Sequence, residues 1–375
     1  MQIPLLDLKA QYRSIKADID AAVARVFDSQ GFILGDEVET CEQGLGEYCG
    51  CTHAVGVSSG TDALLATLMS EGIGPGDEVL TTAYSFFATG GSIARVGARP
   101  VFIDIDPQSY NINPNLVEAS ITPRTRGLMP VHLYGQIAEM DRLLAVATKH
   151  NLLVIEDAAQ AIGAEYQDQK ACAMGMYGCL SFFPSKNLGG AGDGGMVLTN
   201  DADRAANLRR LRTHGAKLSY RHESIGGNFR LDALQAAVIA AKLPYLDSWT
   251  TARQTHARSY QQWFQETTPV RDGLLKLPQC PQNPRSHVFH QYVIRTPRRD
   301  DLKSFLEQRG IRSAIYYPIP LPLQPCFAYL GCQPDDFPES RKAAQETLAL
   351  PIYPELTEDQ IQAIVQAVND FFAKG

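Results

Sequence analysis

The chain reads LSFFPSKN over residues 180–187, which places Lys186 directly after a short apolar run. A glycine-rich stretch, residues 189–195, follows at once. Upstream, residues 154–160 read VIEDAAQ, an apolar run that ends in acid at Asp157. A lysine in an apolar setting loses its charge more easily, and its neutral amine is a nucleophile toward carbonyls.

Asp157 gives a second indication of the chemistry. At the end of a buried strand, Asp157 can keep the ring nitrogen of a cofactor protonated. Lys186 can bond to an electrophilic aldehyde, and Asp157 can hold a ring nitrogen in its protonated form. Together the two residues predict pyridoxal phosphate, held as a Schiff base. The spacing of the two residues is compatible with adjacent crossovers in a sheet, and an aspartate that caps a helix is the alternative.

The first two-thirds of the chain alternate short apolar strands with helical patterns. Helices are expected over residues 63–70, 86–96 and 143–150. Strands are expected over residues 53–57, 77–82, 100–105, 127–132, 152–157, 180–183 and 195–199. Such alternation predicts an α/β fold, with a large, mostly parallel sheet covered by helices on both faces.

The pattern changes after Leu231, where a long helical stretch runs to Phe264 with a break at Pro244. A proline-rich connection leads to a smaller unit. There we expect strands over 287–295 and 311–317, a helix over 301–310, and a last helix after Thr357, whose threonine and following glutamine form a capping box. The predicted domains are 1–245, the large cofactor-binding domain with an N-terminal segment, and 246–375, a smaller C-terminal α+β domain.

Composition excludes several classes of function. The 375 residues carry a net charge of −7 without a Lys/Arg block, which argues against nucleic acid as a partner. No apolar run approaches the roughly 18 residues of a membrane span, and the start of the chain lacks a signal-peptide core. The eight cysteines form no C-x-x-C pair. We therefore expect a cytoplasmic protein without a metal site.

Three further motifs can be read in two ways. Residues 57–64, VSSGTDAL, form a strand, a turn and a helix start that suits a phosphate group, although an ordinary helix cap explains them too. Phe86 follows the strand that ends near Thr82, where an aromatic ring can stack on a planar ligand or pack in the core. His132, His214 and Ser181 could form a hydrolase triad, but Ser181 lacks the G-x-S-x-G elbow.

The order of the motifs SGTDAL (59–64), DAAQA (157–161), SFFPSK (181–186) and GGNFR (226–230) resembles the DegT-type sugar aminotransferases. The resemblance extends from residue 31 to residue 320. It implies an aspartate-aminotransferase-like fold of type I and pyridoxal 5'-phosphate as cofactor.

The resemblance also implies a role for each matching residue. Lys186 would form the Schiff base and carry protons, and Asp157 would pair with the pyridinium nitrogen. Gln160 would lie near the ring hydroxyl, and Phe86 would stack on the ring. The phosphate would be held by Gly60, Thr61, Ser181 and, from the neighbouring subunit of a homodimer with shared active sites, Asn228.

The substrates follow from the same resemblance. Some relatives carry histidine in place of the lysine and dehydrate their substrates, so Lys186 indicates transamination. The implied reaction moves an amino group from L-glutamate to a nucleotide-linked keto-sugar, with Tyr316 and Tyr317 as substrate contacts. The stretch YYPIPL (316–321) resembles enzymes that act at C3, on a UDP-linked 2-acetamido uronate or a dTDP-linked 6-deoxyhexose. C4 transamination of a 4-keto-6-deoxy sugar is the alternative.

One departure from the family pattern and two rival functions stay open. Relatives often read Tyr-Pro-x-Pro-x-His, and Pro322 stands where that histidine would fall. A non-catalytic, cofactor-binding regulator could use the same fold. A nucleotide-dependent dehydrogenase could use the loop 189–195, although this loop lacks the Walker lysine and precedes a strand.

Overall fold

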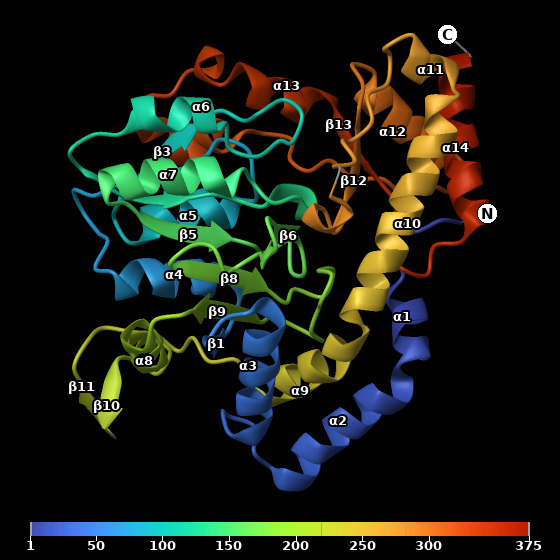
Figure 1. Ribbon diagram of the computed structural model, residues 1–375. Helices are drawn as coiled ribbons and strands as arrows, with labels where there is room; N and C mark the ends of the chain where they lie inside the picture. The colour runs from blue at the N-terminus through green and yellow to red at the C-terminus, as the bar shows by residue number, and fades with distance from the viewer. Residues whose placement is uncertain (1, 219, 282, 374–375) are drawn as a thin grey trace.

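The computed structural model describes residues 2–218, 220–281 and 283–373. A seven-stranded sheet in the order β1-β9-β8-β5-β4-β2-β3 forms the centre of the large domain (Figure 1). Strand β9 runs antiparallel to both of its neighbours, and the remaining strands share one direction. The sheet consists of β1 (His53–Val57), β2 (Glu78–Thr82), β3 (Arg99–Ile103), β4 (Thr125–Met129), β5 (Leu153–Asp157), β8 (Tyr177–Ser181) and β9 (Gly195–Thr199).

Helices cover both faces of this sheet, as the strand composition predicts. Successive side chains of a strand point to opposite faces. Val154 therefore belongs to the core beneath one face and Ile155 to the core beneath the other. The first core includes α3 (Asp36–Cys49), α7 (Met140–His150) and α9 (Ala233–Lys242). The second includes α4 (Gly60–Ser70), α5 (Phe87–Arg95) and α8 (Ala202–Leu211).

The predicted strands and helices of the large domain are confirmed to within a few residues at each end. The break at Pro244 is also present, because a 3₁₀ turn over Leu243–Tyr245 separates α9 from α10 (Leu246–Gln265). Two short hairpins and several turns were not predicted. The hairpin strands are β6 (Glu165–Tyr166), β7 (Gln169–Lys170), β10 (Ala216–Leu218) and β11 (Arg221–His222).

The smaller domain surrounds a two-stranded antiparallel sheet of β12 (Tyr292–Arg295) and β13 (Thr347–Leu350). Helices α10 and α14 lie side by side along it (Figure 1), and further helices complete the domain. The capping box at Thr357 is confirmed, since Thr357 and Gln360 exchange side-chain bonds with each other's main-chain N–H. Helix α14 spans Glu358–Ala373, and the further helices are α11 (Thr268–Arg271) and α12 (Arg299–Gln308).

The strand predicted over residues 311–317 is wrong. The segment makes isolated bridges at Ile311 and Ala314, and β12 pairs with β13 instead. Beyond Ala314 the chain leaves the small sheet, because the main chain at Tyr316 is bonded to tyrosine side chains of the large domain. Alternation of apolar residues alone could not reveal these distant partners.

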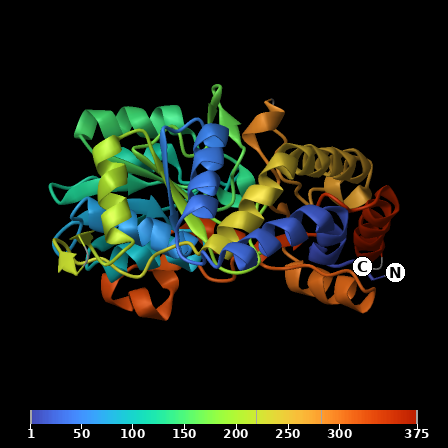
Figure 2. The same ribbon diagram turned by 90° about the horizontal axis from the view of Figure 1, so that it is seen from below.

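The chain passes between the two cores more than once. Near its start, Ile3 bridges to Ile311 and packs in the core of the small domain. Helices α1 (Leu8–Ser14) and α2 (Lys16–Ser29) then lead to the large domain, where α2 packs on α9 (Figures 1 and 2). Further along, Leu321 and Phe327 pack against Phe102 of β3 in a core of their own.

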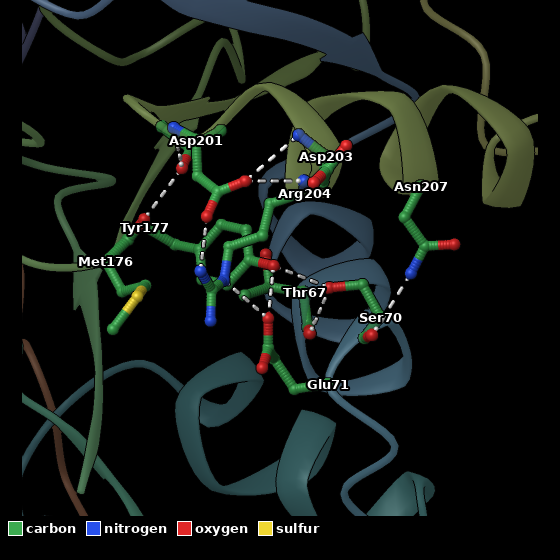
Figure 3. A network of polar contacts seen from close by, with 10 residues as sticks. Thr67, Ser70, Glu71, Met176, Tyr177, Asp201, Asp203, Arg204 and Asn207 are labelled. Carbon is green, nitrogen blue, oxygen red and sulfur yellow. Dashed lines mark hydrogen bonds and ion pairs between the residues drawn. The ribbon is translucent and has the colours of Figure 1, made fainter. Parts of the chain in front are cut away.

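Helix α4 is anchored at its C-terminal end by a polar network (Figure 3). Arg204 of α8 donates to Glu71 at 2.9 Å and to Asp201 at 2.6 Å. The Tyr177 hydroxyl also donates to Glu71, at 2.6 Å. Partly buried charged groups with several partners hold their geometry better than exposed pairs do. The network therefore fixes the end of α4 that lies away from the carboxyl edge of the sheet.

Within the described ranges, no helix has both the length and the apolar character that crossing a bilayer requires.

Candidate active site

The carboxyl edge of the parallel strands gathers most of the predicted site residues. Asp157 ends β5, Ser181 ends β8, and Gly60 opens α4 shortly after β1. Phe86 precedes α5, after β2, and Lys186 lies in the turn that follows β8. In open α/β sheets, ligands bind beyond these strand ends.

The first turn of α4 forms a cradle for an anion. Its N–H groups have no partners within the helix and lie at the positive end of its dipole. A Cβ atom on Gly60 would lie 2.6 Å from the Cβ of Ser181, and one on Gly195 would lie 2.3 Å from the Ser59 carbonyl oxygen. Glycine at both positions therefore allows α4, β8 and β9 to approach one another closely. Thr61 follows Gly60 in the first turn of α4.

Asp62 does not oppose an anion in this cradle. Its carboxylate accepts hydrogen bonds from the hydroxyls of Ser58, at 2.6 Å, and Ser59, at 3.0 Å. Its main-chain N–H donates to Ser59 Oγ, the N-cap of α4. The negative charge is thus bound to the two serines that precede the helix.

Asp157 is a buried acid with few partners. Only 5% of it is exposed. Thr89 Oγ1 donates to its Oδ2 at 2.8 Å, and the N–H of Ala159 donates to its Oδ1 at 3.3 Å. Burial raises the pKa of Asp157, while these hydrogen bonds and the nearby Lys186 oppose that rise. A turn rather than a helix follows Asp157, so the helix-cap alternative does not hold.

Lys186 is held in a tight turn and is desolvated. Its main-chain N–H donates to the Phe183 carbonyl at 2.8 Å. A Cβ atom on Gly189 would lie 2.3 Å from the Pro184 carbonyl oxygen, so the glycine is needed to close the turn. Burial lowers the pKa of Lys186 to about 8, against the opposing charge of Asp157. Near neutral pH the uncharged fraction of this amine is therefore larger than that of an exposed lysine.

Gln160 connects two parts of the site. Its Oε1 accepts from the N–H of Tyr134 at 2.7 Å, and its Nε2 donates to the Tyr317 hydroxyl at 3.1 Å. The ring of Tyr317 lies 6.0 Å from the ring of Phe86. Phe86 is 55% exposed, so the core-packing alternative does not hold for it.

The model of the DegT/DnrJ/EryC1/StrS aminotransferase family matches residues 13–369. The chain belongs to this family.

Relatives and solved structures agree over nearly the whole length. The chain is 43% identical to a UDP-N-acetyl-3-dehydro-alpha-D-glucosamine 3-aminotransferase of Acidithiobacillus ferrooxidans. The matched region covers 98% of the chain and 97% of the relative. It is 48% identical, over 99% of both chains, to a protein of Geobacillus stearothermophilus named pleiotropic regulatory protein. The crystal structure of S. venezuelae DesV with a ketimine intermediate superimposes with a TM-score of 0.94 at 42% identity, covering 99% and 98% of the two chains.

The chain is therefore an aminotransferase with the fold of the pyridoxal-phosphate-dependent enzymes of its family, and its cofactor is pyridoxal phosphate. Its residues fit that group. The desolvated amine of Lys186 suits the aldehyde, and the buried carboxylate of Asp157 suits the ring nitrogen. The N-terminus of α4, where Gly60 allows close approach to Ser181, suits the phosphate.

Asn228 and Pro322 are two further positions of this aminotransferase that the family pattern singles out. Asn228 is exposed on the loop after β11, and its main chain pairs with Thr213 rather than with the site. Pro322, at the family's histidine position, is buried in the 3₁₀ turn Leu321–Leu323. Neither residue contacts Lys186 through a hydrogen bond among the described residues.

The hydrolase triad does not form. His132 Nδ1 accepts from the N–H of Ala138 at 3.3 Å, so its Nε2 carries the proton and donates to Glu156 at 2.9 Å. Both side chains are fully buried. Glu156 also accepts from the N–H groups of Cys172 and Met174. Both ring nitrogens of His132 are engaged in hydrogen bonds with Ala138 and Glu156, so neither serves as a base toward Ser181.

Sequence reasoning missed the tyrosines that position the segment with Tyr316 and Tyr317. Tyr84 donates to the Tyr316 carbonyl at 2.8 Å and accepts from the Tyr317 N–H at 2.7 Å. Tyr134 donates to the same carbonyl. The partners lie more than 180 residues apart along the chain, and no local pattern could have shown the contact. They hold Tyr317 over the site.

Proposed function

We propose that this aminotransferase moves the amino group of L-glutamate to C3 of a nucleotide-linked keto-sugar. The observation that carries the proposal is a desolvated Lys186 close enough to the buried Asp157 for each to shift the pKa of the other. The named 3-aminotransferases among the relatives support the position of the new amine.

Each residue of the site has a defined task in this proposal. When bound, the cofactor supplies a conjugated ring that accepts the electrons of a deprotonated carbon. Lys186 holds the aldehyde and afterwards moves a proton at its Nζ between donor and acceptor positions. Asp157 holds the proton on the ring nitrogen. Gly60, Thr61 and Ser181 orient the phosphate, while Phe86 and Tyr317 exclude water from the ring.

The substrate is tested by a screen of nucleotide keto-sugars with L-glutamate. Release of 2-oxoglutarate with a 3-keto sugar, and little with the matching 4-keto sugar, is the expected result. A preference for the 4-keto sugar would establish the C4 alternative instead. Absence of turnover with every sugar, in a protein that binds the cofactor, would favour the non-catalytic regulator, a role that the name of the Geobacillus relative also suggests.

The proposal includes a homodimer with shared sites. Exposed side chains support it: Asn228 on its loop, and the nearby Ile225 and Tyr220, which are 89% and 98% exposed. Large apolar side chains that are exposed in one short segment, rather than scattered singly over the surface, are typical of interaction surfaces. A second copy would cover them and bring its Asn228 to the phosphate cradle of the first.

Complementation tests the shared site. K186A and N228A dimers should each be impaired, and mixing them after mild dissociation should recover about a quarter of the wild-type activity, because half of the random dimers contain one intact site of two. K186A mixed with D157N is the matched control and should recover nothing, since both lesions lie in the same half-site. Recovery in neither mixture would show that each chain builds its own site.

The reaction is further proposed to take place in the cytoplasm. The eight cysteines are all unpaired in the structure, as expected for a reducing compartment.

A further inference from the structure

The two oxygens of the Asp157 carboxylate are held unequally. Oδ2 accepts a short bond, 2.8 Å, from the Thr89 hydroxyl. Oδ1 accepts a long bond, 3.3 Å, from the N–H of Ala159. A hydroxyl donor at 2.8 Å is near its optimum, whereas an N–H donor at 3.3 Å is beyond the usual range. Oδ1 is therefore the oxygen with capacity to accept a further strong hydrogen bond.

A second hydroxyl fixes the direction of the first. Ser85 Oγ lies 3.0 Å from Thr89 Oγ1. A hydroxyl has a single proton, and that of Thr89 is given to Asp157. The Ser85 hydroxyl must then donate to Thr89, which makes a one-way chain from Ser85 to Thr89 to Asp157. Ser85 is 4% exposed and Thr89 is 1% exposed, so water does not compete for these bonds.

Local structure explains how these residues meet. Ser85 follows β2, and Thr89 lies one turn later in α5, so both face the end of β5 across the edge of the sheet. Asp157 is 68 positions further along the chain. The three residues thus connect the segment after β2 with the end of β5, past the intervening strand β4, at the place where the cofactor ring must lie.

We propose that Thr89, supported by Ser85, is a positioning residue that turns the Asp157 carboxylate so that Oδ1 faces the protonated ring nitrogen of the cofactor. The hydroxyl chain also stabilises the negative charge that this contact needs, because a hydrogen bond donated to a buried carboxylate favours its ionised form. The proposal rests on the cofactor and is independent of which sugar the enzyme uses.

Other titratable groups also interact electrostatically with the Asp157 carboxylate, and the test has to separate their effects from that of the Thr89 hydroxyl. They belong to β8, to the loops that follow β4 and β8, and to the small domain. These groups are Lys186, His132, Cys179 and Tyr317.

The test is T89V, which replaces the hydroxyl by a methyl group of similar size. Titration of the apoprotein with pyridoxal phosphate should show an affinity about tenfold lower than wild type, the loss expected for one hydrogen bond to a charged group. In the loaded protein, the pH midpoint of the cofactor's visible absorption band should move upward. A ring nitrogen that holds its proton less firmly repels the proton on the lysine-bound nitrogen less strongly.

Two variants separate positioning from packing. T89S keeps the hydroxyl and should restore both the affinity and the midpoint. T67V is the matched control, because Thr67 is equally buried and its hydroxyl donates to the Ala63 carbonyl within α4, lies 3.6 Å from Cys179 Sγ and makes no hydrogen bond to Asp157 among the described residues. T67V should leave the absorption midpoint unchanged even if it lowers the melting temperature.

The proposal fails if T89V shows the wild-type affinity and midpoint, or if T67V moves the midpoint as far as T89V does. Should T89V not fold, S85A offers the same test, because it removes the second hydroxyl of the chain and leaves Thr89 in place. S85A should lower the cofactor affinity about threefold, since it weakens the bond indirectly. Unchanged affinity and midpoint in S85A would then overturn the proposal.

Discussion

Replacing Lys186 with alanine should lower transamination by more than about 10⁴-fold, the upper end of what a positioned proton-transfer group contributes. K186A loses both the covalent attachment of the aldehyde and the base that moves the proton. The measurement is release of 2-oxoglutarate from L-glutamate in the presence of the preferred keto-sugar.

The fold should survive this change. Lys186 donates no side-chain hydrogen bond within the described structure, and its desolvated amine makes no ion pair at contact distance there. The melting temperature of K186A should therefore stay close to that of wild type. K149A is the matched control, because Lys149 is exposed and pairs with Glu118 on the surface. Retention of most of the activity in K186A would overturn the assignment of the site.

The second large effect is expected for D157N, which keeps the shape of the side chain and removes its charge. The ring nitrogen would lose the partner that keeps it protonated, and loss of one member of a buried charge pair costs roughly 3–5 kcal/mol. We expect turnover to fall by roughly 10²–10³-fold, together with weaker cofactor binding. Steady-state kinetics and cofactor titration of the apoprotein measure the two effects.

A surface aspartate provides the control for D157N. Asp203 is exposed in the first turn of α8, and D203N should leave both quantities unchanged. If D157N kept wild-type turnover, the charge of Asp157 would have no part in the reaction, and the proposed role of Thr89 would fall with it.

The sequence was most informative where function depends on segments that are continuous in the chain. The strand that ends at Asp157, the turn with Lys186 and the start of α4 at Gly60 each combine apolar periodicity with a polar residue at a strand end. Such local patterns can be read directly. The order of the motifs then identified the family, which the family model confirmed.

The missed features depend on contacts between distant segments. Thr89 reaches Asp157 across two crossovers, and Tyr84 reaches the main chain of residues 316 and 317 from the other domain. The error over residues 311–317 has the same origin. A short apolar run becomes a strand only if it pairs along its length, and this run bridges to β13 at Ala314 before the main chain at Tyr316 is bonded to tyrosines of the large domain.

The repeated passage of the chain between its two cores has a consequence for evolution and engineering. Ile3 lies in the core of the small domain, while Leu321 and Phe327 lie against the large one. A cut between residues 245 and 246 would leave Phe102 uncovered on one fragment and a gap at Ile311 on the other. The halves are therefore not independent modules, and exchanging one of them for that of a relative would disrupt apolar packing on both sides of the cut.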